Sequence, residues 1–171
     1  MRVSGGMLRN RIIKSSQQKM VRPTSAKMRE AIFSMIGQDL QGMSFLDAFG
    51  GSGIMGIEAY SRGAYPVVIS EKNRKSFRSI QTSIQDLNID ITVRCQPAKR
   101  AILSSDWDII FLDPPYAFDI QPYLDLSFQQ SQALVIAEMS IDRISECSHS
   151  DWLVCKEKRY GSSKLLIFQK R

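Results

Sequence analysis

An apolar strand near the middle of the chain ends in a proline-rich tetrapeptide whose polar groups could hold an amine. Residues 109–112 are followed by Asp113-Pro114-Pro115-Tyr116. Two prolines stiffen this loop and remove two backbone donors, so the carbonyl groups of Asp113 and Pro114 are left as acceptors. The Asp113 side chain and the Pro114 carbonyl can each accept one N–H of a planar amino group, while Tyr116 stacks on the attached ring. We therefore predict chemistry at an exocyclic amine, with Asp113, Pro114 and Tyr116 as catalytic residues.

An earlier loop has the glycine spacing of a nucleotide-binding turn. The glycines stand in the run Asp47-Ala48-Phe49-Gly50-Gly51-Ser52-Gly53-Ile54-Met55-Gly56. We interpret Gly51 as the residue that lets the chain turn sharply, Gly53 as the point where a ligand approaches the backbone, and Gly56 as a close helix–strand contact. Glu71 ends the next predicted strand and is expected to accept hydrogen bonds from ribose hydroxyl groups.

Asp47, at the start of this run, discriminates between two cofactors that contain a nucleoside. Nicotinamide dinucleotides and S-adenosylmethionine can both be bound by a turn of this kind. Asp47 is expected at the carboxyl end of its strand, on the ligand side of the loop. A carboxylate there would repel a pyrophosphate and attract the ammonium group of S-adenosylmethionine. If Asp47 points toward the ligand, the methyl donor is favoured.

Alternating strands and helices are expected to position both loops. The hydrophobic pattern predicts strands over 44–49, 66–70, 91–94, 107–112, 133–138, 152–156 and 165–169. It predicts helices from 23–25 to Gly37, over 54–62 and over 73–87. Such alternation is typical of an α/β, doubly wound, mainly parallel sheet. No helix is predicted between the last two strands, which are therefore expected to pair antiparallel.

Positive charge is concentrated at the two ends of the chain. The 171 residues include 23 Lys and Arg against 17 Asp and Glu, a net charge of +6. Eight basic residues precede the first acid: Arg2, Arg9, Arg11, Lys14, Lys19, Arg22, Lys27 and Arg29. This clustering is expected for a protein that binds a phosphate backbone, although it also favours solubility. Residues 1–20 are expected to form a short basic hairpin or arm, anchored by Val3, Ile12 and Ile13.

Length and composition exclude several classes of protein. A chain of 171 residues is one ordinary domain, and its 3 cysteines do not suit a secreted disulfide scaffold. No apolar run approaches the roughly 18 residues of a membrane helix, and the N-terminus lacks the apolar segment of a signal peptide. An Arg-rich transit peptide is the alternative for this N-terminus, but Gly5-Gly6 and Pro23 would interrupt its helix. Cys147, His149 and Cys155 lack the spacing of a zinc site, so no metal is expected.

With these motifs in place, the sequence resembles the RsmD-type 16S ribosomal RNA guanine-N2 methyltransferases over nearly its whole length. The shared segments are Arg2-Val3-Ser4-Gly5-Gly6, Arg22-Pro23-Thr24, Arg29-Glu30-Ala31-Ile32-Phe33, residues 46–53, residues 56–64, Glu71, residues 113–116, Glu138 and residues 158–163. The tetrapeptide is shared with DNA adenine-N6 methyltransferases. The N-terminal segments are much more specific to the family.

The resemblance implies a Rossmann-like class I methyltransferase fold over 23–171, preceded by a basic arm over 1–22. It implies transfer of a methyl group from S-adenosylmethionine to N2 of a guanine, number 966 in the family's rRNA numbering, in 16S ribosomal RNA of an assembling 30S particle. The expected cofactor-binding residues are Asp47, Phe49, Gly51, Ser52, Gly53, Glu71 and Ala98. The expected RNA-binding residues are Arg2, Arg9, Arg11, Arg22 and Thr24. We expect a cytoplasmic monomer without membrane association.

The chain departs from the family at three positions. Gly50 replaces a usual Ala, Ala26 replaces a common acid, and Pro97 stands where an Asp usually contacts the adenine amine. The last change leaves at most a backbone amide of Ala98 or Lys99 for adenine and predicts weaker cofactor affinity. The alternatives are an adenine-N6 DNA or other amine methyltransferase, a non-catalytic RNA-binding module on the same fold, and a nicotinamide-dependent enzyme.

Overall fold

Seven strands form one sheet in the computed structural model, which describes residues 1–13, 25–115, 118–141 and 149–171. They are β1 (Phe45–Asp47), β2 (Val67–Ser70), β3 (Thr92–Arg94), β4 (Trp107–Leu112), β5 (Ser131–Ser140), β6 (Trp152–Tyr160) and β7 (Ser163–Lys170). Their order in the sheet is β3-β2-β1-β4-β5-β7-β6. The first five strands pair in parallel, and β7 is antiparallel to both β5 and β6. The predicted doubly wound sheet and its antiparallel end are confirmed.

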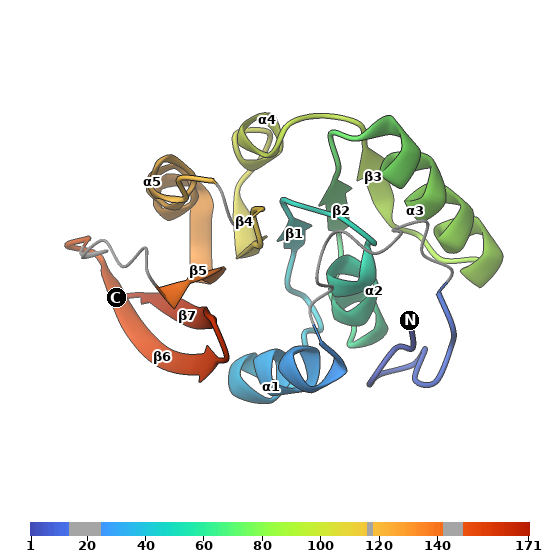
Figure 1. Cartoon of the computed structure of the whole chain (residues 1–171), viewed down its shortest axis with the longest axis horizontal. Coiled ribbons are helices and arrows are strands. Elements are labelled where there is room, and N and C mark those ends of the chain that lie inside the picture. The colour runs from blue at the N-terminus through green and yellow to red at the C-terminus, as the bar shows by residue number, and fades with distance from the viewer. Residues whose placement is uncertain (14–24, 116–117, 142–148) are drawn as a thin grey trace.

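Helices cover both faces of the sheet because the strands are apolar on both sides. The helices are α1 (Ala26–Ile36), α2 (Ile54–Ser61), α3 (Arg74–Leu87), α4 (Ala98–Ile102) and α5 (Gln121–Gln130). Phe45 and Ile109 pack in the same core as α1, α2 and α3, whereas their neighbours Leu46 and Ile110 pack in the core of α4 and α5. Figure 1 shows these two helical layers on opposite sides of the sheet.

Two helices and several strand ends differ from the sequence prediction. The hydrophobic pattern predicts no helix over α4, which has five residues, or over α5, which carries Pro122 near its start. The antiparallel strands β5, β6 and β7 are longer than predicted because they pair with one another well beyond their apolar centres. β1 is shorter than predicted because the chain already turns at Ala48.

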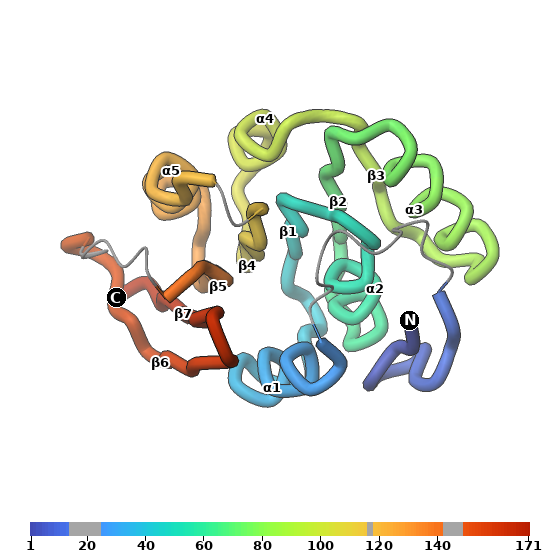
Figure 2. The backbone as a smooth tube through the Cα atoms, in the orientation of Figure 1, coloured from blue at the N-terminus to red at the C-terminus, as the bar shows by residue number. Residues whose placement is uncertain are grey.

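Residues 1–13 form a hairpin, whereas the rest of the segment predicted as a hairpin or arm, residues 14–20, lies outside the described residues. Arg2 and Ile12 pair antiparallel, and the backbone N–H of Val3 donates to the Arg11 carbonyl (3.0 Å). Val3 and Ile13 are buried in the core, but Ile12 is 67% exposed, so its prediction as an apolar anchor is wrong. Figure 2 shows the hairpin in dark blue beside α2. The boundary at residue 22 between arm and domain lies outside the described residues and stays a prediction.

Among the described helices, none combines the length and the apolar character needed to cross a membrane.

Candidate active site

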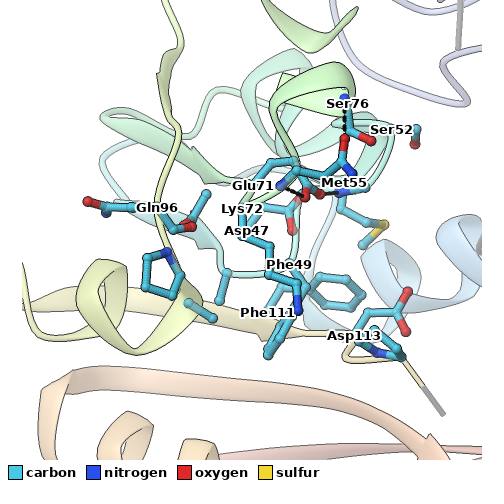
Figure 3. Close-up of a pocket in the computed structure, with 18 of the residues that line it drawn as sticks. Asp47, Phe49, Ser52, Met55, Glu71, Lys72, Ser76, Gln96, Phe111 and Asp113 are labelled. Carbon is cyan, nitrogen blue, oxygen red and sulfur yellow. Dashed lines mark hydrogen bonds between the residues drawn. The ribbon is translucent and has the colours of Figure 1, made fainter. Parts of the chain in front are cut away.

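A cavity of about 410 Å³ lies beyond the carboxyl ends of the parallel strands (Figure 3). Its walls come from the loops after β1, β2, β3 and β4 and from the first turns of α2 and α3. This is where open α/β sheets bind ligands, at the point where the strand order changes direction between β1 and β4. The loops therefore bring together the aspartates of the two sequence motifs, Asp47 and Asp113, in one cavity.

Asp47 lines this cavity although it is only 1% exposed. Its Oδ2 accepts a long hydrogen bond from the backbone N–H of Gly56 (3.3 Å), and its Oδ1 is buried without a hydrogen-bond partner. Burial raises the pKa of Asp47 from 3.8 to about 7, and the nearby Glu71 carboxylate adds to this rise. A cationic group in the cavity would relieve both effects, which agrees with the predicted inward orientation of Asp47.

Glu71 connects the loops that follow β1 and β2. Its Oε2 accepts a hydrogen bond from the Gly51 N–H (2.8 Å), and its Oε1 accepts one from the Asn73 N–H (2.7 Å). Asn73 also caps α3, because its side chain accepts hydrogen bonds from the backbone N–H groups of Lys75 and Ser76. The carboxylate is thus held at the cavity wall, where each oxygen keeps a second lone pair for a ligand hydroxyl.

Three glycines of this loop, Gly50, Gly53 and Gly56, leave no room for a side chain because isoleucines pack closely against them. A Cβ on Gly56 would lie 2.5 Å from Ile69 Cγ1, and one on Gly50 would lie 2.6 Å from Ile69 Cγ2. Gly53 has a φ of +79°, and a Cβ there would lie 2.9 Å from Ile80 Cγ2. The close packing predicted for Gly56 is confirmed. Gly53 faces Ile80 and is not among the residues that line the cavity.

Three aromatic rings form one wall of the cavity. Phe49 lies 5.2 Å from Tyr123 and 6.3 Å from Phe118 between ring centroids. Lys72 Nζ lies 5.1 Å from the Phe118 ring, and Lys99 Nζ lies 5.4 Å from the Tyr123 ring. Sequence reasoning identified Phe49 but missed the other four side chains, because they stand outside both motifs and only the fold brings them together.

The third loop contributes Gln96, Pro97 and Ala98 to the cavity. Pro97 precedes α4 as its N-cap, so Ala98 is the first helical residue and its N–H has no acceptor within the helix. The Ala98 N–H is therefore a free helical donor next to Pro97, the residue that replaces the Asp expected from the family resemblance to contact adenine.

Some of the remaining predicted site residues line the cavity, some do not, and some lie outside the described residues. Asp113 and Pro115 line the cavity, as do Phe49, Gly51 and Ser52, whereas Pro114 is not among the lining residues. In the view of Figure 3, Asp113 lies on the other side of Phe49 from Glu71. Tyr116, Arg22 and Thr24 lie outside the described residues.

The predicted RNA-binding arginines of the hairpin are exposed, in contrast to one other member of the basic cluster. Arg2, Arg9 and Arg11 all face solvent. Arg29 is 3% exposed and its Nε is paired with Glu58 Oε1 at 3.2 Å, so this arginine is part of the core.

Comparison with known proteins agrees with the fold, which is that of a Rossmann-like class I methyltransferase. The family model described as "Conserved hypothetical protein 95" matches residues 1–169. YlbH of Bacillus subtilis (strain 168) is 31% identical over 100% of both chains. The protein named ribosomal RNA small subunit methyltransferase D in Buchnera aphidicola subsp. Acyrthosiphon pisum is 33% identical over 67% of this chain and 62% of its own length. The solved structure of yhhF from Escherichia coli superposes with a TM-score of 0.88 at 22% identity, covering 100% of this chain and 98% of that chain.

The chain belongs to the family of this model, that of the RsmD-type methyltransferases.

Proposed function

We propose that this protein uses S-adenosylmethionine to methylate N2 of a guanine in 16S ribosomal RNA, guanine 966 in the family's numbering, on an assembling 30S particle. The observation that carries the proposal is that Asp47 and Asp113 line the same cavity. The name of the Buchnera relative, a ribosomal RNA small subunit methyltransferase, supports RNA of the small subunit as the substrate.

The residues of the cavity fit S-adenosylmethionine. The unpartnered Oδ1 of buried Asp47 suits the ammonium group of its methionine part, and Glu71 suits the ribose hydroxyl groups. Phe49, Gly51 and Ser52 line the methionine end of the site, Gly53 shapes the turn that carries them, and the Ala98 N–H is offered to adenine. When bound, the cofactor supplies a methyl group on a positively charged sulfur, which is open to attack by a nitrogen.

Asp113 and Pro114 hold the guanine amine in this proposal. The Asp113 carboxylate and the Pro114 carbonyl each accept one N–H, which directs the nitrogen lone pair toward the methyl group. Most of the rate enhancement then comes from alignment. As the N–C bond forms and the S–C bond breaks, positive charge grows on the nitrogen, and Asp113 stabilises this charge and takes up the released proton. Tyr116 stacks on the base.

RNA binding is assigned to the exposed arginines Arg2, Arg9 and Arg11 and to Arg22 and Thr24. The target base has to leave its stack to reach the cavity, which costs a few kcal/mol and least where the base is already unpaired. The described residues form one α/β sheet with its helices and a short hairpin, so we propose that a cytoplasmic monomer recognises the particle rather than free RNA.

The test is methyl transfer from labelled S-adenosylmethionine to under-methylated small ribosomal particles, followed by digestion and identification of the nucleoside. We expect N2-methylguanosine, reduced at least ~100-fold by Asp113→Ala. Asp106→Asn is the matched control, because Asp106 is exposed at the opposite end of β4 and its charge is far from the cavity. Label in adenine, DNA or protein would refute the substrate, and binding of RNA without transfer would favour the RNA-binding module.

A further inference from the structure

A buried carboxylate fixes the N-terminal hairpin to the helix that follows the glycine loop. Glu58 on α2 is 0% exposed. Its Oε1 accepts the backbone N–H of Ser4 (2.8 Å), and its Oε2 accepts the Ser4 hydroxyl (2.9 Å). Arg29 and Arg62 both pair with the same carboxylate. Each arginine also reaches the hairpin, since Arg29 Nη2 donates to the Arg2 carbonyl (2.9 Å) and Arg62 Nη2 to Ser4 Oγ (3.2 Å).

The turn of the hairpin rests on the last residue of α2. Ser61 Oγ donates to the Gly5 carbonyl (2.6 Å) and accepts the Leu8 N–H (2.8 Å). The Ser61 carbonyl accepts the Met7 N–H (2.7 Å). Gly6 has a φ of +72°, and a Cβ on it would overlap the Ser61 carbonyl, so only glycine permits this approach. The family-specific start of the sequence therefore serves the docking of the hairpin.

The docked hairpin carries exposed basic side chains among the described residues. Arg2, Arg9 and Arg11 are exposed on it. Met7 and Ile12 of the same hairpin are 71% and 67% exposed. Arginine with interspersed apolar side chains is the composition of a surface for RNA, where the guanidinium binds phosphate and the apolar groups contact sugars or bases.

We propose that the hairpin is a rigid second contact for the RNA, held by Glu58 and Ser61 at a fixed distance from the methyl-transfer cavity. These two residues are positioning residues, which act through the arginines of the hairpin. The proposal rests on the proposed function, because it assumes an RNA substrate. α2 has eight residues and begins directly after the glycine loop, so the hairpin turn lies about 12 Å along the helix from that loop. The contacted phosphates are thus separate from the target base.

Rigid docking has an energetic consequence that the experiment can measure. A preformed arm binds RNA without first losing its own conformational freedom, so its arginines contribute more than they would on a free tether. Undocking the arm should weaken RNA binding and leave cofactor binding unchanged. Glu58→Gln is unsuitable as the main variant, because it leaves two buried arginines without a carboxylate and destabilises the whole fold.

Gly6→Ala is the main variant, and Ser61→Ala, which removes only the hydroxyl group, is the milder one. Gly42→Ala is the matched control, because Gly42 has a φ of +78° and a Cβ there would meet nothing within 4 Å. We expect Gly6→Ala to raise the KM for particles about tenfold, while kcat at saturation and the Kd for S-adenosylmethionine stay within about twofold. Gly42→Ala carries similar backbone strain and should leave the KM unchanged.

A double-mutant cycle with Arg9→Ala/Arg11→Ala distinguishes positioning from general stability. In the wild-type background this pair should raise the KM and reduce the salt dependence of RNA binding by up to about 2 in logarithmic slope. In the Gly6→Ala background the same pair should have a much smaller effect. Additive effects, or an equal rise in KM for Gly42→Ala, would overturn the inference. If wild-type protein methylates no RNA, the proposed function fails instead.

Discussion

The buried carboxylate of Asp47 should make the cofactor-free protein less stable at neutral pH, and Asp47→Asn tests this directly. The substitution keeps the shape of the side chain and removes its charge. Burial raises the pKa of Asp47 from 3.8 to about 7 in the folded protein. Because the folded state holds the proton more tightly than the unfolded state, the free energy of unfolding falls as the pH rises through this interval and is level above it.

A difference of about three pKa units corresponds to about 4 kcal/mol at most. The amide side chain of the Asp47→Asn variant is neutral at every pH, so this variant should match the wild type near pH 4 and exceed its stability by up to about 4 kcal/mol at pH 8. The other titrating groups are common to both proteins and cancel in this comparison. Urea unfolding at both pH values provides the measurement, with Asp106→Asn as the control for loss of an exposed carboxylate.

Cofactor binding should change in the opposite direction. Loss of the charged hydrogen bond to the ammonium group should weaken S-adenosylmethionine binding roughly 30- to 150-fold at pH 8. Wild-type affinity should rise as the pH approaches 7, since Asp47 has to ionise, and this rise should be absent in Asp47→Asn. Calorimetric titration measures both effects. A variant that is no more stable at pH 8 would refute the desolvation argument, and unchanged affinity would refute the ammonium contact.

Three further substitutions have separate readouts. Glu71→Gln leaves the N–H of Gly51 or of Asn73 facing an amide donor and weakens a proposed ribose ligand, so cofactor affinity measured by calorimetry should fall about tenfold. Gly50→Ala forces a Cβ against Ile69 and should lower the free energy of unfolding in urea by about 1–3 kcal/mol; an unchanged value would mean that the loop relaxes freely. Ser25→Ala removes the N-cap hydrogen bond of α1 and should cost about 1 kcal/mol in the same assay, without effect on cofactor affinity.

The centre of the fold is predictable because its strands are short apolar runs closed by recognisable turns. The predicted bounds of β4 match the structure to the residue, and the glycine loop and Glu71 are both expected at strand ends that meet at one edge of the sheet. Parallel strands must present their carboxyl ends together, so the cavity follows from the topology.

What sequence reasoning misses depends on contacts between distant segments. The sequence analysis groups Arg29 with the N-terminal basic cluster because the residues before it are basic. The fold instead buries Arg29 against Glu58. Ile12 is expected to anchor the hairpin because it is apolar. A two-stranded hairpin buries only one face, however, and Ile13 lies on the buried face while Ile12 lies on the exposed one. The roles of Phe118 and Tyr123 in the cavity wall follow from the position of α5, which has a weakly amphipathic sequence.

The packing of Ile69 constrains how this loop can evolve. One isoleucine on β2 fills the space that a methyl group at Gly50 or Gly56 would need. The family resemblance implies an Ala at the position of Gly50 in relatives, and wherever a relative has that Ala, its β2 residue has to leave room that Ile69 does not. We therefore expect the two positions to vary together among homologues, with a larger residue on the strand wherever the loop has lost its methyl group. A substitution at only one of the two positions would leave the contact overpacked or underpacked, so we expect substitutions at the two positions to occur together.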